Sequence, residues 1–283
     1  MARIAVLGTL AVDRVVRLER PLQVGGHQQG EALAPRCGGG AANAAAALAR
    51  AGHRVTLVSA VGDDAAGREL VATLAAVGVD TAEVARLPQP TSNSLLLVDP
   101  KGERTIVNLQ RLHAPAPERL LQLPLDCVYV RSRAPGLAPL LAELSRRTCV
   151  VAHLPPCTAG AVPARVLVGS APDLDAAFLA DPYTAGRRAS DGRADWTVVT
   201  RGGAGATAYG HDATLNQPAL PATPVDTTGA GDCFAAGLVH GLVTGLGMAH
   251  CLAVAAAWGA AAVGGDGSLP GVAFPPPLPP APA

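Results

Sequence analysis

The chain has 283 residues, enough for one large α/β domain with an added element or for two small domains. Hydrophobic residues make up 49% of it, so a sizeable core can be buried, while aromatic residues make up only 3%. The formal net charge is zero and no basic run occurs, which argues against the clustered Lys and Arg of a nucleic-acid groove. We therefore expect no nucleic-acid partner.

The cysteines and the first residues indicate a cytoplasmic protein. None of the six cysteines pairs as CxxC and several lie in apolar runs, which is typical of reduced thiols. Met1 leads almost directly into the strand-like run Ile4–Leu7, and no secretory signal is visible. The stretch Cys233–Gly265 lacks charged residues, but its many glycines and its break at Gly245–Gly247 favour two buried helices over a membrane span. We expect no membrane partner.

Strand-like and helix-like runs alternate along the chain. The predicted strands are Arg3–Gly8, Arg54–Val61, Cys127–Val130, Cys149–Ala152, Ala176–Leu179 and Trp196–Thr200. The predicted helices are Ala41–Ala51, Ala65–Val77, Leu137–Arg146, Gly231–Leu242 and Met248–Val263. Apolar strands separated by helices predict an α/β fold in which helices cover both faces of a mainly parallel sheet.

Two segments interrupt this alternation. Residues 14–36 contain a mixed polar run, and residues 91–109 predict a hairpin with its turn at Pro100–Gly102. Together they predict a small β-sheet that forms a lid over the C-terminal edge of the main sheet, where open α/β folds bind ligands. We expect one domain over residues 1–273 and a proline-rich tail at 274–283.

The segment Val225–Phe234, which reads VDTTGAGDCF, carries the strongest chemical signal. Gly229, Ala230 and Gly231 are small enough to let backbone N–H groups at a helix start form an anion hole. A carboxylate beside such a hole, Asp232, suits a base that takes a proton from a hydroxyl while the hole stabilises a transferred phosphoryl group. A lone Asp there would be a helix cap, but the whole run predicts a phosphotransferase.

This run resembles the signature of the ribokinase-like, or PfkB-type, carbohydrate kinases. GGGAAN at 38–43 is similar to the N-terminal signature of that family, GTLAVD at 8–13 to its first strand with a sugar-binding Asp, and VGDDAAG at 61–67 to a further family run. The similarity extends from about residue 3 to 270. It implies a ribokinase-like fold with a β lid, a kinase that uses ATP and Mg²⁺, and a homodimer that forms through the lids.

The resemblance also implies residue roles. Asp232 is the expected base, and Gly229, Ala230 and Gly231 form the expected anion hole. The expected sugar ligands are Asp13, Gly39, Gly40 and Asn43, and the acid and amide types among them suit sugar hydroxyls. The expected nucleotide-binding residues are Thr200, Gly202, Gly205 and Thr228. Asp226 is expected to belong to a loop that binds a monovalent cation such as K⁺.

Two metal features depart from the family pattern. The Asn-x-x-Glu motif that organises Mg²⁺ through water is missing, and the region taken to correspond to it has Asp181 as its acidic residue. Residues Val263–Pro270 look compact beside the cation-binding loop of the family, which leaves K⁺ dependence open.

Other nucleotide and metal motifs are disfavoured. A Walker P-loop is excluded because Lys101, the only lysine, lies in a hairpin turn. GAGATA at 203–208 is followed by a turn rather than a helix, which argues against a dinucleotide site. The histidines show no zinc-binding spacing.

The sequence is compatible with several classes of acceptor substrate. Residues 101–108 are similar to hairpins of fructokinase-like and ketohexokinase-like members, and Arg104, Asn108 and Arg133 are candidate substrate ligands. If Asn108 and Arg133 face the pocket, they can bind an anionic substituent, as in the similar sulfofructose kinases. The alternatives are a neutral hexose or pentose, a sulfonated or phosphorylated ketose, a nucleoside, and a non-catalytic sugar or nucleotide sensor. The near absence of aromatic residues from the N-terminal half argues against the nucleoside.

Overall fold

The computed structural model describes residues 1–115, 117–132, 134, 136–154, 161–223, 225–265, 269, 271 and 274–276. Within these ranges the main sheet has ten strands, in the order β15-β14-β13-β12-β11-β10-β1-β5-β6, with β7 beside β5. The strands are β1 Arg3–Gly8, β5 Arg54–Gly62, β6 Val79–Asp80, β7 Val84–Leu87, β10 Cys127–Arg131, β11 Cys149–His153, β12 Val166–Ser170, β13 Trp196–Thr200, β14 Ala206–Gly210 and β15 Thr214–Gln217. All the pairings are parallel except those of β14 with β13 and β15.

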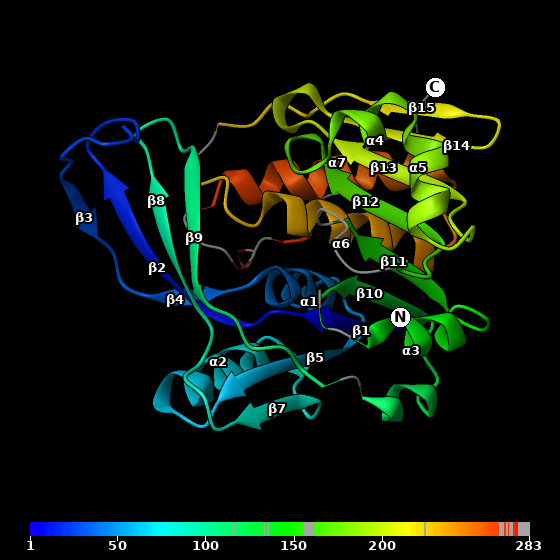
Figure 1. The fold of residues 1–283 in the computed structure, drawn as a ribbon, viewed down its shortest axis with the longest axis horizontal. Helices are drawn as coiled ribbons and strands as arrows, with labels where there is room; N and C mark the ends of the chain where they lie inside the picture. The colour runs from blue at the N-terminus through cyan, green and yellow to red at the C-terminus, as the bar shows by residue number, and fades with distance from the viewer. Residues whose placement is uncertain are drawn as a thin grey trace.

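Helices cover both faces of this sheet (Figure 1). They are α1 Gly40–Arg50, α2 Ala65–Ala76, α3 Leu137–Leu144, α4 Ala176–Ala180, α5 Pro182–Ala189, α6 Ala230–Val243 and α7 Met248–Val263. The alternation of side chains along β1 divides the core, since Ile4 and Val6 pack with α1 and α6, whereas Ala5 and Leu7 pack with α3. The predicted α/β architecture is therefore confirmed.

The uncharged stretch from Cys233 to Gly265 forms α6 and α7, which lie side by side in the core. A Cβ atom at Gly237 would come within 2.9 Å of the Cα atom of Ala255, so the two helices approach too closely for a larger residue there. Among the described residues, no helix combines the length and the apolar character needed to cross a membrane. Cys157 lies outside the described ranges, and the described cysteines are free thiols.

A separate second sheet stands beside the carboxyl ends of the parallel strands, at the left of Figure 1. Its strands are β2 Ala11–Leu18, β3 Gly30–Ala32, β4 Arg36–Gly38, β8 Asn93–Val98 and β9 Arg104–Gln110, in the order β3-β2-β8-β9 with β4 beside β2. β8 and β9 pair antiparallel, so the hairpin predicted within residues 91–109 is observed. Val15, Leu96 and Val98 form the small core of this sheet.

One predicted strand is wrong. Ala176–Leu179 belongs to helix α4, because the Asp175 side chain accepts a hydrogen bond from the Phe178 N–H at 2.7 Å and caps the helix. The strand at this place in the sheet is β12, Val166–Ser170, which was not predicted. Its short apolar run lies between β11 and β13 and completes the parallel part of the sheet.

Candidate active site

The N-terminus of α6 lies where the sequence predicted an anion hole. Gly229, with φ at +79°, turns the chain into the helix, and the Cys233 N–H donates to the Gly229 carbonyl oxygen at 2.8 Å. A Cβ atom at Gly231 would meet nothing within 4 Å, so the space in front of this turn is open. The first N–H groups of a helix have no acceptor inside it, which leaves this end suited to an anion.

Asp232 is buried in the first turn of α6, and other elements hold both of its carboxylate oxygens. Asn43, in the first turns of α1, donates from Nδ2 to Oδ2 at 2.8 Å. Arg131, at the end of β10, donates from Nε to Oδ1 at 2.6 Å. The predicted base and one predicted sugar ligand are therefore in direct contact, and a residue that the sequence reasoning did not select completes the set.

Three consecutive glycines make room for the charged side chains. A Cβ atom at Gly38 would lie 2.0 Å from Oδ2 of Asp13, the buried acid on β2. Gly39 has φ at +99° and lies against the Thr9 carbonyl oxygen, while a Cβ atom at Gly40 would lie 2.0 Å from Nε of Arg131. Any larger residue at Gly38 or Gly40 would push the carboxylate or the guanidinium out of place.

Arg111, which follows β9, adds a second cation to this region. Its Nη2 donates to Oδ1 of Asn108, while its Nη1 is buried with no hydrogen-bond partner among the described residues. Burial lowers the pKa of Arg111, the negative charge of Asp13 opposes that shift, and the positive charge of Arg131 adds to it. We call Asp13, Arg111, Arg131 and Asp232 the charged cluster.

The surroundings of Arg131 favour its charged form. Burial alone would lower the pKa of Arg131, but the charge of Asp232 and the hydrogen bond to it, with a smaller contribution from Asp173, raise it. The guanidinium therefore stays charged beside the Asp232 carboxylate.

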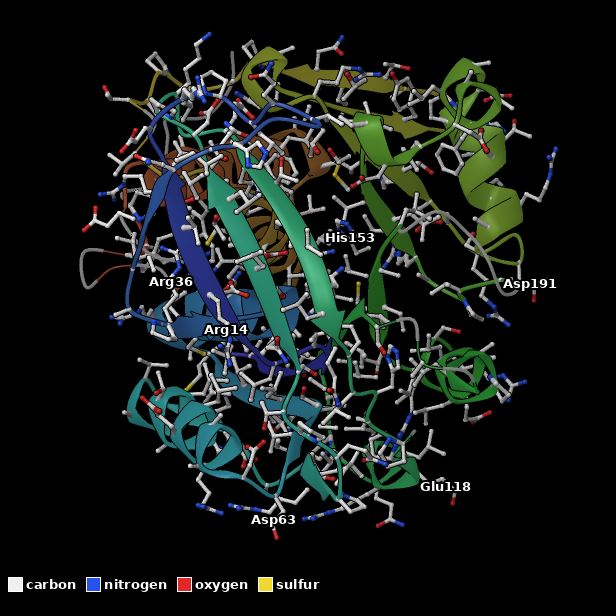
Figure 2. All side chains as sticks on the ribbon, turned by 60° about the vertical axis from the view of Figure 1, so that its left-hand side comes forward. Arg14, Arg36, Asp63, Glu118, His153 and Asp191 are labelled. Atoms are coloured by element: carbon white, nitrogen blue, oxygen red, sulfur yellow. The ribbon has the colours of Figure 1, made fainter. Side chains whose placement is uncertain are left out.

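The second sheet contacts the loop before α6 at two points. Arg36 on β4 donates from Nη2 to Oδ2 of Asp226 at 2.5 Å, and Figure 2 shows Arg36 on this sheet. Arg104 on β9 donates from Nη1 to Oγ1 of Thr227 at 2.8 Å, and the same hydroxyl donates to the carbonyl oxygen of Gly102 at 3.0 Å. The loop that leads into the anion hole is thus fastened to the second sheet.

The carboxylate of Asp226, the residue predicted to bind a monovalent cation, already has two donors. Its Oδ1 accepts the N–H of Thr228 at 2.8 Å and its Oδ2 accepts Arg36, whose guanidinium balances its charge. Burial alone would raise the pKa of Asp226, but the hydrogen bonds from Thr228 and Arg36 outweigh it and lower the pKa. Part of Val263–Pro270, the other segment considered for this cation, lies outside the described residues.

For a magnesium ion, Asp173 is placed better than the predicted Asp181. Asp181 caps α5, where its Oδ1 accepts the Thr184 N–H at 3.1 Å. Asp173 lies just after β12, at the carboxyl edge of the sheet, and its charge reaches Arg131. Mg²⁺ bound with a nucleotide needs one or two carboxylates besides water and phosphate oxygens, so one acid at this edge fits. No group of three potential metal ligands occurs among the residues that the structure describes.

The predicted nucleotide-binding residues lie at the end of β13 and at the start of α6. The Thr200 Oγ1 donates to the Gly169 carbonyl oxygen at 3.4 Å, next to the end of β12. Gly202 and Gly205 have φ at +53° and +87°, and a Cβ atom at Gly205 would lie 2.2 Å from the Gln217 carbonyl oxygen. The Thr228 hydroxyl is buried and has no partner in the described part of the chain, so it is available to a ligand oxygen.

The structure thus brings most predicted site residues to one edge of the sheet, with their roles still predictions. Arg133 lies outside the described residues. The sequence reasoning missed Arg111 and Asp173, and of the two arginines at the end of β10 it chose Arg133 rather than Arg131. Strand alternation could have indicated Arg131, because it shares a face with Tyr129, whose side chain packs in the core with α1 and α6.

Comparisons with known proteins agree with this geometry. The chain matches the family described as pfkB family carbohydrate kinase over residues 1–129 and 166–272. It is 29% identical over 282 residues to an ATP-dependent ribose-1-phosphate kinase of Halopiger xanaduensis, covering 95% of this chain and 94% of the relative. It is 31% identical to a fructokinase of Klebsiella pneumoniae over 249 residues, covering 75% of this chain and 79% of the relative.

A solved structure of a relative has the same fold. The ribokinase from Cryptococcus neoformans, solved in complex with ADP, superposes with a TM-score of 0.76 at 25% identity and covers 96% of this chain and 98% of its own. This chain belongs to the pfkB family of carbohydrate kinases, and it is an ATP-dependent phosphotransferase with the ribokinase-like fold.

Proposed function

We propose that the chain transfers the γ-phosphate of ATP to a sugar hydroxyl, with Asp232 as the catalytic base. The observation that carries this proposal is the position of Asp232, buried in the turn that opens α6 and held by Asn43 and Arg131. A carboxylate that served only as a helix cap would accept the N–H groups of its own turn, as Asp175 does at α4. Asp232 instead faces groups from α1 and β10.

In the reaction, the acceptor hydroxyl donates its proton to Asp232 as its oxygen attacks the γ-phosphorus, and ADP leaves. The N–H groups at Gly229, Ala230 and Gly231 stabilise the charge that develops on the phosphoryl oxygens. Mg²⁺, when bound with the nucleotide, neutralises phosphate charge, and Asp173 is the residue we assign to hold it. Asp13 and Asn43 orient the acceptor through its hydroxyls, beside the backbone of Gly39 and Gly40.

We assign the second sheet the role of a lid. Its contacts with Asp226 and Thr227 hold the loop before the anion hole against the sheet, and a site closed in this way keeps water from the γ-phosphate.

The outer strand β9 exposes Ile106, Val107 and Leu109, at 44%, 43% and 58% of their surface. An apolar edge of this kind suits pairing of two lids in a homodimer, which sedimentation velocity would detect.

The acceptor class has two candidates. By their names, the fructokinase relative acts on a neutral sugar and the Halopiger xanaduensis relative acts on a phosphorylated one. The nucleoside acceptor considered from the sequence has no specific support in the charged cluster, which offers charges rather than aromatic faces.

The test is ATP consumption on a panel of ribose, fructose, their phosphates, sulfofructose and nucleosides, with wild type and Asp232→Asn. We expect turnover on a sugar and a loss of about 10²–10⁴-fold in the variant, because the amide cannot accept the proton. ATP binding, measured by calorimetry, should be retained. Turnover on nucleosides alone, or equal turnover in Asp232→Asn, would contradict the proposal.

A further inference from the structure

We propose that the acceptor carries an anionic group, a phosphate or similar oxyanion, which binds Arg111 and Arg131 and thereby frees Asp232 to act as the base. This inference rests on the proposed role of Asp232 and names the substrate class for that site. Its starting observation is that the base is held in an ion pair, since the Asp232 Oδ1 accepts the Arg131 Nε at 2.6 Å.

A neutral acceptor would have to compete with that ion pair. Hydrogen bonds between two charged groups are roughly twice as strong as neutral ones, and Asp232 is buried, which strengthens the pair further. A sugar hydroxyl on its own offers one neutral donor to the same oxygen. The bond to Arg131 therefore protects the base from a plain sugar.

Arg111 supplies the second half of the anion site. Its Nη1 is buried without a hydrogen-bond partner among the described residues. A buried N–H donor without an acceptor costs free energy, so an acceptor atom of a ligand would stabilise it. The positive charge of Arg131 contributes to lowering the pKa of Arg111, so the two guanidinium groups repel each other electrostatically. One anion bound to both groups relieves that repulsion and satisfies the buried nitrogen.

Arg131 can turn toward such an anion. It uses only Nε in its bond to Asp232, which leaves its two Nη groups as donors, and it lies over Gly40, where no side chain blocks it. The vacated Oδ1 then accepts the proton of the acceptor hydroxyl. The new O–P bond forms as the bond from the γ-phosphorus to the bridging oxygen of ADP breaks, so the proton ends on Asp232 and the negative charge on ADP.

The test compares each sugar with its own phosphate. We expect wild type to prefer the phosphorylated acceptor in kcat/KM. Arg131→Gln should lower kcat/KM for phosphorylated acceptors about tenfold to a hundredfold while raising kcat for the neutral sugar, because the anion contact is lost and the base is uncovered. Arg111→Gln should raise KM for the phosphorylated acceptor alone. The matched control is Arg14→Gln. Arg14 is an exposed arginine on β2, and Figure 2 shows it on the same sheet as Arg36. This variant should leave the kinetic constants for both phosphorylated and neutral acceptors unchanged.

Binding separates this inference from the kinase assignment. Calorimetry with Asp232→Asn and a sugar phosphate measures the anion site without turnover, and adding Arg111→Gln should abolish that binding. If wild type uses neutral and phosphorylated sugars equally and Arg131→Gln slows both alike, the inference is overturned while the kinase assignment stands. If sugar phosphates bind but no acceptor is turned over, the kinase proposal fails and the anion site remains. Should Arg131→Gln not fold, Arg111→Gln tests the inference instead. A loss of its preference for phosphorylated acceptors supports the inference, and an unchanged preference overturns it.

Discussion

Two small residues set the positions of the charged side chains in the site. Gly38 lies against the Asp13 carboxylate and Gly40 against the Arg131 guanidinium, so the backbone of this turn forms one wall of the acceptor site that we propose. At neither position does a positive φ require glycine. The requirement there is steric, because each glycine faces a charged side chain.

Gly38→Ala tests this wall. The added methyl group would meet the Asp13 Oδ2 at 2.0 Å, so the carboxylate must move from its place. We expect KM for the acceptor to rise by about tenfold, with KM for ATP unchanged, because the displacement is confined to the acceptor side. The control is Gly247→Ala at the start of α7, where the methyl group meets nothing within 4 Å and φ is −65°. Equal effects on both substrates would show that Gly38 supports the fold and not the acceptor.

At the scale of elements, the main feature is the connection between β4 and the loop before α6. Arg36 and Asp226 are 190 residues apart in sequence, yet their ion pair joins the second sheet to the anion hole. The guanidinium places a positive charge at the carboxylate where the family resemblance predicted a monovalent cation. We expect from this pairing that activity does not need K⁺.

Arg36→Met follows from this pairing. We expect the wild-type rate to be the same when K⁺ is replaced by choline at constant ionic strength. The variant should lose about tenfold or more in kcat, because a buried carboxylate is left without its partner. Arg36→Lys keeps the charge and should retain more activity. Strong activation of the wild type by K⁺, with no loss in Arg36→Met, would show that Arg36 does not replace the cation.

At the scale of the whole molecule, a pair of histidines joins the first strands to the last helices. His53 accepts the N–H of Ala2 at its Nδ1, and its Nε2 lies 2.9 Å from the Nδ1 of His240 on α6, whose ring packs near Trp258. Trp258 in turn contacts Phe274, with ring centroids 4.8 Å apart. Ala2, Trp258 and Phe274 therefore lie around these two imidazoles.

These histidines make the fold sensitive to acid. Burial, together with the charges of His240 and the N-terminus, lowers the pKa of His53 from 6.5 to about 4, and burial also lowers the pKa of His240. The unfolded chain thus binds more protons between these values, so stability is intact above pH 6.5 and falls as the pH drops toward 4.

Urea unfolding at pH 7.5, 6 and 5 measures this dependence. His53→Gln keeps a hydrogen-bonding side chain without the titration, so its free energy of unfolding should fall less between pH 7.5 and 5 than that of the wild type. The exposed His211 gives the control His211→Gln, which should follow the wild type. Parallel curves for the wild type and His53→Gln would remove this pair as the cause of the acid sensitivity.

Much of the fold was predictable because its signals are local. The run DTTGAGD before an apolar segment predicted the start of α6, and the turn at Pro100–Gly102 predicted the β8–β9 hairpin. Both features depend on backbone conformations and hydrogen bonds within a few residues. Ala176–Leu179 was mistaken for a strand because four apolar residues are compatible with a strand or a helix. The side chain of Asp175 caps this segment and favours the helix.

The sequence by itself determined the alternation of strands and helices, the glycine turns and the acid at the start of α6. Only the tertiary structure decided which positively charged side chain contacts that acid. Asp232 and Arg131 are 101 residues apart and Asp226 and Arg36 are 190 apart, so each pair depends on how β10 and β4 pack against α6. Local sequence cannot specify such contacts, because they form only when the sheet and its helices bring distant segments to one edge.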